Sequence, residues 1–267
     1  MDLCSRLPSR MNYCKELTVF DLTVNKFDGS IPKGILNLEK LQWLALGGND
    51  LTGNIPPILT NSSRLQVLDI SRNNIKGSIP SDLWRLSDLK QLSFQFNYLT
   101  GSIPKTIFNI SSLQEIFLGD NFLSGNLPLE TSLPCPSLET LYIGYNNLSG
   151  PIPPYLSNCS NLVKVDFDSN LFSGPIPKSI GDLKFLEELV LERNQLTGEL
   201  GYQEQSFLSS LSNCKFLKFV SISSNPLDIK IPDSIENFSD SLHTFLAFQS
   251  QIKGCIPMGI GSLKGLT

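Results

Sequence analysis

Residues Asn25 to Pro80 read NKFDGSIPKGILNLEKLQWLALGGNDLTGNIPPILTNSSRLQVLDISRNNIKGSIP. This stretch contains the motif Asn-x-(Leu/Ile/Phe)-x-Gly-x-Ile-Pro three times. Outward from this stretch, a leucine opens each copy of a longer repeat, and these leucines are Leu17, Leu41, Leu65, Leu89, Leu113, Leu138, Leu162, Leu186, Leu217, Leu242 and Leu266. Self-similarity at such a period is typical of stacked repeats. We expect one repeat domain over 1–267, with a partial repeat at 1–16, ten complete repeats at 17–265 and a truncated repeat from 266.

Each repeat follows the template LxxLxLxxNxLxGxIPxxLxxLxx, and its letters have physical roles. The spacing of Leu44 and Leu46 predicts a short strand with one buried face. The asparagine after it, such as Asn49, can donate to and accept from the backbone of neighbouring turns. The glycine, such as Gly53, indicates a tight turn, and Ile-Pro ends a second extended piece.

A single repeat cannot bury its apolar face, so neighbouring repeats must stack. The sequence therefore predicts an α/β repeat solenoid, with short parallel strands on its concave face and 3-10 or loop segments on its convex side.

Composition and motifs exclude several function classes. The net charge of −4 and the scattered Lys and Arg residues disfavour nucleic acid as a partner. No apolar run is long enough to span a bilayer, and the first residues contain no apolar stretch of signal-peptide length. The single His243 completes no zinc set, and Gly259-Ile260-Gly261 lacks the lysine signature of a phosphate loop. We expect no catalytic residue, metal or cofactor.

The LxGxIP element resembles the plant-specific leucine-rich repeat of receptor-like kinases and receptor-like proteins. FLSSLSNCKFLKFVSISSNPL (207–227) and LHTFLAFQSQIKGCIPMGIGSLKGL (242–266) are similar to ectodomains of the receptor kinase subfamily that includes bacterial-pattern receptors. The resemblance implies a right-handed superhelix on the extracellular side of the plasma membrane. It also implies that the chain is a fragment without caps, membrane helix or serine/threonine kinase domain, and therefore no enzyme itself.

Two functions fit this resemblance. The first is recognition of a peptide, protein or glycan ligand in innate immune or developmental signalling, with a possible co-receptor kinase as a second partner. The alternative is a secreted inhibitor or decoy that resembles the polygalacturonase-inhibiting proteins. The eighth repeat is extended by an insertion near residues 199–210, which argues against the alternative and supplies a loop that could touch a ligand.

Residues three, five, seven, eight and ten of each repeat are expected to face the concave side, where repeat proteins bind their partners. The candidate ligand-binding residues at these positions are Gln91, Gln95, Phe96, Phe117, Asp120, Tyr142, Tyr145, Asp166, Asp168, Glu192 and Arg193. Aromatic residues beside charges are the composition of interface hot spots, although Phe and Tyr also suit half-exposed strands. We hypothesise an apolar anchor near Phe117 and Tyr142 and a basic ligand group near Asp166 and Asp168.

Modification sites follow the same periodicity. The glycosylation sequons begin at Asn61, Asn109, Asn147, Asn158 and Asn237. Four cysteines lie three residues before an opening leucine, namely Cys14, Cys135, Cys159 and Cys214. The favoured interpretation is that they are buried, reduced thiols acting as small apolar residues. The alternative is a bridge between Cys135 and Cys159 in adjacent repeats.

Overall fold

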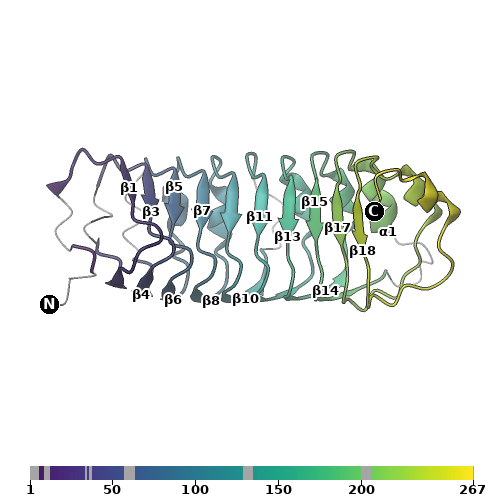
Figure 1. Cartoon of the computed structure of the whole chain (residues 1–267), viewed down its shortest axis with the longest axis horizontal. Coiled ribbons are helices and arrows are strands. Elements are labelled where there is room, and N and C mark those ends of the chain that lie inside the picture. The colour runs from purple at the N-terminus through teal and green to yellow at the C-terminus, as the bar shows by residue number, and fades with distance from the viewer. Residues whose placement is uncertain are drawn as a thin grey trace. The chain divides into compact units, whose positions relative to one another are not determined.

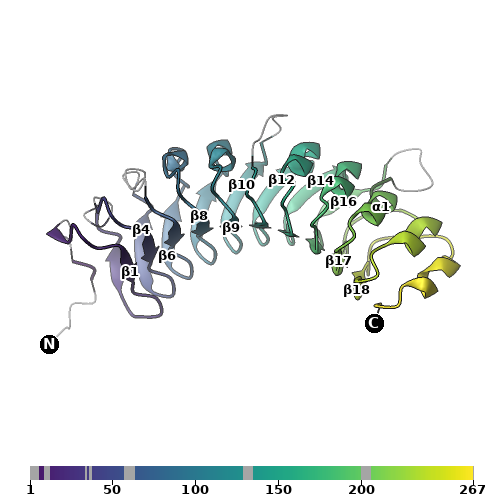
Figure 2. The same ribbon diagram turned by 90° about the horizontal axis from the view of Figure 1, so that it is seen from above.

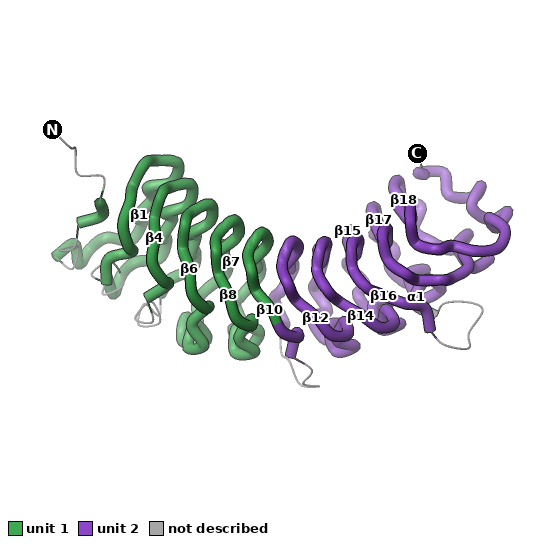
Figure 3. Tube along the Cα trace, turned by 90° about the horizontal axis from the view of Figure 1, so that it is seen from below, with its two compact units in different colours: residues 1–124 green, residues 125–267 purple. Residues whose placement is uncertain are grey.

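The computed structural model describes residues 6–8, 13–33, 35, 38–56, 64–128, 135–199 and 206–266. They belong to two compact units, unit 1 (residues 1–124) and unit 2 (residues 125–267), each of which is a stack of repeats (Figure 3). The two units are therefore described one at a time.

The LxxLxL segment of every complete repeat forms a three-residue strand, which we call the first strand (Figure 1). In unit 1 the first strands are β1 (Val19–Asp21), β3 (Trp43–Ala45), β5 (Val67–Asp69), β7 (Gln91–Ser93) and β9 (Glu115–Phe117). In unit 2 they are β11 (Thr140–Tyr142), β13 (Lys164–Asp166), β15 (Glu188–Val190), β17 (Phe219–Ser221) and β18 (Thr244–Leu246). They pair in parallel and in phase with the repeat, so that Trp43 lies beside Val67 and Lys164 beside Glu188.

The LxG segment forms a second strand, and these strands make a sheet of their own. They are β2 (Asp28–Ser30), β4 (Asp50–Asn54), β6 (Asn74–Gly77), β8 (Tyr98–Gly101), β10 (Phe122–Asn126), β12 (Asn147–Gly150), β14 (Leu171–Pro175) and β16 (Gln195–Thr197). In repeats one to seven the template glycine lies within this strand or at its last residue rather than in a turn. Gly150, for example, has φ 78°, and a Cβ there would come within 2.7 Å of the Asn126 side chain. Sequence reasoning expected the extended piece and missed the sheet.

After Ile-Pro the chain makes a short 3-10 turn before it returns to the next first strand. These turns are η4 (Leu83–Arg85), η5 (Lys105–Asn109), η6 (Pro154–Asn158), η7 (Lys178–Asp182), η8 (Leu211–Asn213), η9 (Asp233–Asn237) and η10 (Met258–Ser262). Within each unit they lie on the side opposite the first strands (Figure 2). The predicted α/β solenoid with strands on one side and 3-10 segments on the other is confirmed, while the handedness of the superhelix stays a prediction.

The template leucines form the core, and the ladder asparagines hydrogen-bond the backbone groups beside it. Leu141, Leu189 and Leu196 have no exposed surface. Buried Asn170 shows how the ladder works: its Oδ1 accepts from the Leu148 N–H at 3.0 Å, and its Nδ2 donates to the Ile143 carbonyl at 3.0 Å, both in the preceding repeat. In the same way, Asn73, Asn194 and Asn225 bond both their own turn and the repeat before it, which leaves few backbone groups unpaired.

The insertion of repeat eight is only partly described. Residues 200–205 lie outside the described residues, and the rest forms α1 (Ser206–Ser210), which leads directly into η8. Phe207 and Leu208 of this helix are buried. The end of the insertion therefore adds apolar packing to repeat eight.

Candidate functional site

The first strands offer their outward side chains as the most continuous candidate surface of each unit. In β15, for example, Leu189 is fully buried, while Glu188 and Val190 on either side are half-buried. We call the outward residues of the first strands and of the turns that follow them the first-strand face. The predicted candidates lie on it, five in unit 1 and six in unit 2.

Residue eight of every repeat, just before the ladder position, has a left-handed backbone. Phe96, Asp120, Tyr145 and Arg193 have φ of 56°, 53°, 53° and 51°, and Gly48 has 68° in repeat two. For a residue other than glycine this conformation costs on the order of 1 kcal/mol. Sequence reasoning missed it, because a single glycine in ten repeats was the only signal.

The candidates of unit 1 are half-buried or only partly exposed. Phe96 is 37% exposed, but the Arg72 guanidinium lies 4.1 Å from the centre of its ring. Gln91, Gln95, Phe117 and Asp120 are half-buried. An aromatic pair that the template also placed outward, Tyr98 and Phe122, stacks with ring centres 6.1 Å apart.

Arg193 organises the candidates of unit 2. Its Nη1 donates to the Tyr145 hydroxyl at 2.9 Å and lies 3.5 Å from Asp168 Oδ2 and 3.6 Å from Glu192 Oε1. The neighbouring carboxylates raise the pKa of Arg193, Asp168 foremost. The arginine thus ties three successive repeats together at the first-strand face.

Tyr142 and Asp166 lie beside these residues, and both are half-buried. The Tyr142 hydroxyl donates to Glu188 Oε2 at 3.4 Å. Burial, together with the charges of Glu188 and Asp166, raises the pKa of Tyr142 to about 12, so the phenol stays protonated. Burial raises the pKa of Asp166 to about 6, and the charges of Asp168, Glu188 and Glu192 add to this effect against the hydrogen bond from the Asp168 N–H.

Asp168 differs from the expectation that it contacts a ligand. It is only 6% exposed, and its Oδ1 accepts from the Ser169 hydroxyl at 2.9 Å while Oδ2 faces Arg193. Glu192 is likewise engaged, because its Oε2 accepts from the Ser221 hydroxyl at 2.6 Å. Asp168 is therefore a support for Arg193 rather than a contact residue.

The charges of this cluster do not cancel. Tyr142, Tyr145, Asp166, Asp168, Glu188, Glu192 and Arg193 form what we call the tyrosine–acid cluster, with four carboxyl groups and one guanidinium. Such a surface favours a ligand that brings a positive group to the carboxylates and apolar surface to the tyrosines.

The Leucine Rich Repeat family matches the chain at residues 40–62, 64–86, 137–159 and 161–183. The fold is similar to the leucine-rich repeat ectodomain of the Arabidopsis thaliana membrane receptor kinase GASSHO1/SCHENGEN3, solved in complex with CASPARIAN STRIP INTEGRITY FACTOR 2. The identity is 36% and the TM-score 0.91, over 98% of this chain and 30% of that one. This chain has the fold of a leucine-rich repeat solenoid, and it is similar to plant receptor-kinase ectodomains.

Two other similarities agree with this assignment. The Arabidopsis receptor kinase HAESA, solved in complex with the peptide hormone IDA and the co-receptor SERK1, is 30% identical with a TM-score of 0.87, over 98% of this chain and 42% of that one. The receptor kinase-like protein Xa21 of Oryza sativa subsp. japonica is 39% identical over 87 residues, which are 32% of this chain and 8% of that protein. The predicted resemblance is confirmed, and the matched GASSHO1/SCHENGEN3 structure is a leucine-rich repeat ectodomain rather than a kinase domain. The chain spans less than half the length of each of these relatives.

One cysteine interpretation for this leucine-rich repeat chain is corrected. Cys135 and Cys159 form a disulfide between adjacent repeats, with Cα atoms 4.9 Å apart. The favoured interpretation of four reduced, buried thiols was therefore wrong for this pair. It holds for Cys214, which is free and buried, with its pKa raised by burial to about 11, but not for Cys14, which is free and exposed.

The sequon asparagines of the leucine-rich repeat chain lie on accessible surface where they are described. Asn109, Asn158 and Asn237 are exposed at the last residue of η5, η6 and η9, and Asn147 is exposed at the start of β12. Asn61 lies outside the described residues. Carbohydrate on the first three would cover the 3-10 side of each unit and leave the first-strand face open.

His243 and the acidic side chains of the leucine-rich repeat chain form no recognisable catalytic or metal site in its described part. His243 is exposed, and its Nδ1 lies 2.9 Å from the Thr244 hydroxyl. Within the described ranges there is no group of three or more His, Cys, Asp or Glu side chains that could hold a metal ion. The helices of the described part are all too short or too polar to cross a membrane.

Proposed function

We propose that this chain is a ligand-recognition module from the extracellular side of a plasma-membrane receptor-like kinase. The observation that carries the proposal is the tyrosine–acid cluster of unit 2, where four carboxyl groups and one guanidinium adjoin two tyrosines on the first-strand face. The similarity to HAESA, which was solved with a peptide hormone, supports a peptide as the ligand class.

The cluster favours a peptide with one basic residue beside an apolar one. Tyr142 and Tyr145 supply large, rigid side chains that bury area with little loss of entropy. Asp166 and Glu188 supply the charge that orients the basic residue. In an intact receptor of this type, a co-receptor kinase is the second partner we propose, by analogy with the HAESA complex that contains SERK1.

The test is selection of linear 12-residue peptides displayed on phage against the whole chain. Dissociation constants of the enriched peptides are then measured for the parent chain, Tyr142→Ala and Glu188→Gln. Each substitution should weaken binding by about 1 to 3 kcal/mol, which is roughly five- to 150-fold. Glu236→Gln is the matched control, because Glu236 is an exposed carboxylate on the 3-10 side of the same unit.

Peptides that bind all four proteins equally would remove the first-strand face as the site. The polygalacturonase-inhibitor alternative is tested in parallel with a fungal endopolygalacturonase. Inhibition of that enzyme, with no peptide enriched, would support the alternative instead.

A further inference from the structure

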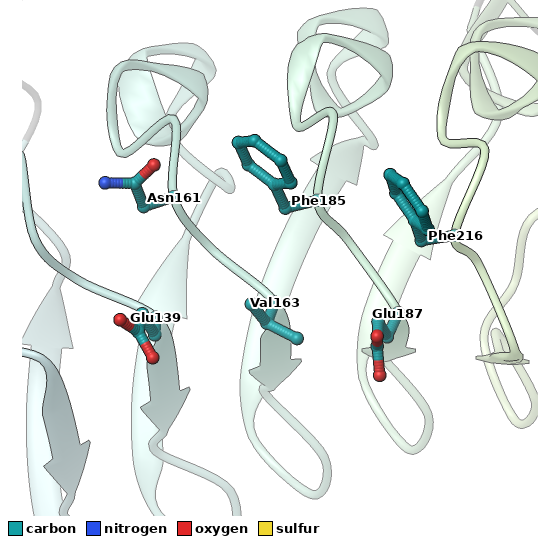
Figure 4. A pocket seen from close by; sticks show the side chains of 6 residues that line it. All are labelled: Glu139, Asn161, Val163, Phe185, Glu187 and Phe216. Atoms are coloured by element: carbon teal, nitrogen blue, oxygen red, sulfur yellow. The ribbon is translucent and has the colours of Figure 1, made fainter.

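A groove of about 430 Å³ runs along the edge of unit 2, away from the tyrosine–acid cluster. Its upper wall consists of Asn161, Phe185 and Phe216, and its lower wall of Glu139, Val163 and Glu187 (Figure 4). These residues lie on the segments that lead into the first strands β11, β13, β15 and β17, and they come from three successive repeats, six to eight.

The two phenylalanines are unusual for their position in the repeat. Phe185 and Phe216 are the last residues of repeats seven and eight, they are 51% and 52% exposed, and their rings stack with centres 6.4 Å apart. The other eight complete repeats end in Lys40, Arg64, Asp88, Ser112, Ser137, Asn161, Ser241 and Gly265. The fold therefore needs no large apolar side chain here, yet two adjacent repeats expose one to water.

The charges of the groove are unequal at its two ends. Glu187 is neutralised by Lys218, whose Nζ lies 2.7 Å from its Oε2. Glu139 is exposed, and within the described part of the chain its carboxylate has no cationic partner. The groove thus combines an exposed apolar wall with one unpaired negative charge at the end beside repeat six.

We propose that this groove binds an extended segment of a partner protein. The segment places an aliphatic or aromatic side chain against Phe185, Phe216 and Val163, and a lysine or arginine beside Glu139. Neighbouring parallel strands are about 4.8 Å apart, so the phenylalanine pair lies roughly 12 Å along the stack from Glu139. Since an extended chain advances about 3.3 Å per residue, the two side chains are three or four residues apart.

Sequon placement agrees with a protein partner at this edge. Within unit 2, Asn158 and Asn237 are acceptors at the ends of η6 and η9. The corresponding residues of repeats seven and eight are Asp182 and Asn213, and Asn213 is followed by Cys214 and Lys215, which form no sequon. Repeats seven and eight, which carry the phenylalanines, therefore have no carbohydrate acceptor at this position, unlike repeats six and nine on either side.

The test is a second phage selection of linear 12-residue peptides on the whole chain, depleted against the double variant Phe185→Ser, Phe216→Ser. Serine ends three other repeats, so the variant should fold, which a thermal melt checks. Peptides that survive depletion should carry Lys or Arg three or four residues from a large apolar residue. Their dissociation constants should rise at least tenfold on the double variant and about five- to tenfold on Glu139→Lys.

Two controls separate this groove from the first-strand face. Tyr142→Ala and Glu236→Lys should leave the affinity of these peptides unchanged. Failure to enrich any peptide sensitive to the double variant would overturn the proposal, and so would enrichment of peptides that are insensitive to Glu139→Lys.

Discussion

The ladder asparagine of repeat seven gives a stability prediction that can be worked from individual atoms. Asn170→Ala removes four hydrogen bonds, but three of the carbonyls involved keep another donor: Ile143 from Asn146, Phe167 from Asn194 and Asp168 from the Tyr145 N–H. The Leu148 N–H is the group left without a partner.

An orphaned, buried N–H costs about 1 to 3 kcal/mol, and the three weakened acceptors add roughly 1 kcal/mol together. We therefore expect Asn170→Ala to lower the free energy of unfolding by about 3 kcal/mol, measured by urea denaturation followed by circular dichroism. Amide exchange should accelerate at Leu148. The matched control is Asn147→Ala, because Asn147 is an exposed asparagine in the neighbouring strand.

Asn170→Ser separates the donor role from the acceptor role, and repeat ten supplies the precedent. Ser250 holds the ladder position there, and its hydroxyl donates to the Ile222 carbonyl at 3.0 Å. The Leu227 N–H, which a ladder asparagine of the next repeat would accept, bonds the Asn225 carbonyl of its own repeat instead, and repeat nine has no second strand. Serine should thus recover less than about 1 kcal/mol. If Asn170→Ala and Asn147→Ala unfold at the same urea concentration, the ladder is not what stabilises the stack.

Three further predictions concern the carboxyl, the disulfide and the sequons. Because the pKa of Asp166 is raised to about 6, its protonated form stabilises the fold below about pH 4, and this stabilisation is lost as the pH rises through 6. Asp166→Asn should remove up to about 3 kcal/mol of this pH dependence from the free energy of unfolding. Identical pH profiles of the two proteins would contradict this. Replacing Cys135 and Cys159 by alanine should lower the free energy of unfolding by about 3 kcal/mol, against no change for Cys14→Ser, because the bridge closes a loop with a sequence separation of 24. In a plant secretory host, intact-mass measurement before and after deglycosylation should show at least two occupied sites among Asn109, Asn147, Asn158 and Asn237, and an unchanged mass would refute this.

The stacking of the fold could be predicted because it depends on residues that recur. Leucines, asparagines and glycines at fixed spacing specify a first strand, a ladder and a second extended piece in every repeat. The second sheet was missed, because the template shows where a strand lies but not that neighbouring strands are close enough to pair.

The candidate site was harder to predict, because it depends on residues that do not recur. The template placed Asp168 outward, but Arg193 and Ser169 draw its carboxylate into a network. Phe185 and Phe216 escaped notice, since they stand at a position that sequence reasoning did not treat as surface. Their signal was present as a departure from the polar residues and the one glycine that end the other repeats.

Because residue eight of each repeat has a left-handed backbone, its side chain is held on the first-strand face although most residues other than glycine disfavour this conformation. Tyr145 and Arg193 hold φ near 50°, which asparagine and glycine adopt more easily. A library selected for thermal stability alone should therefore drift toward Asn at these positions and lose the Arg193–Tyr145 contact. Selection for heat resistance would then favour Asn at positions 145 and 193, whereas selection for binding would favour Tyr and Arg.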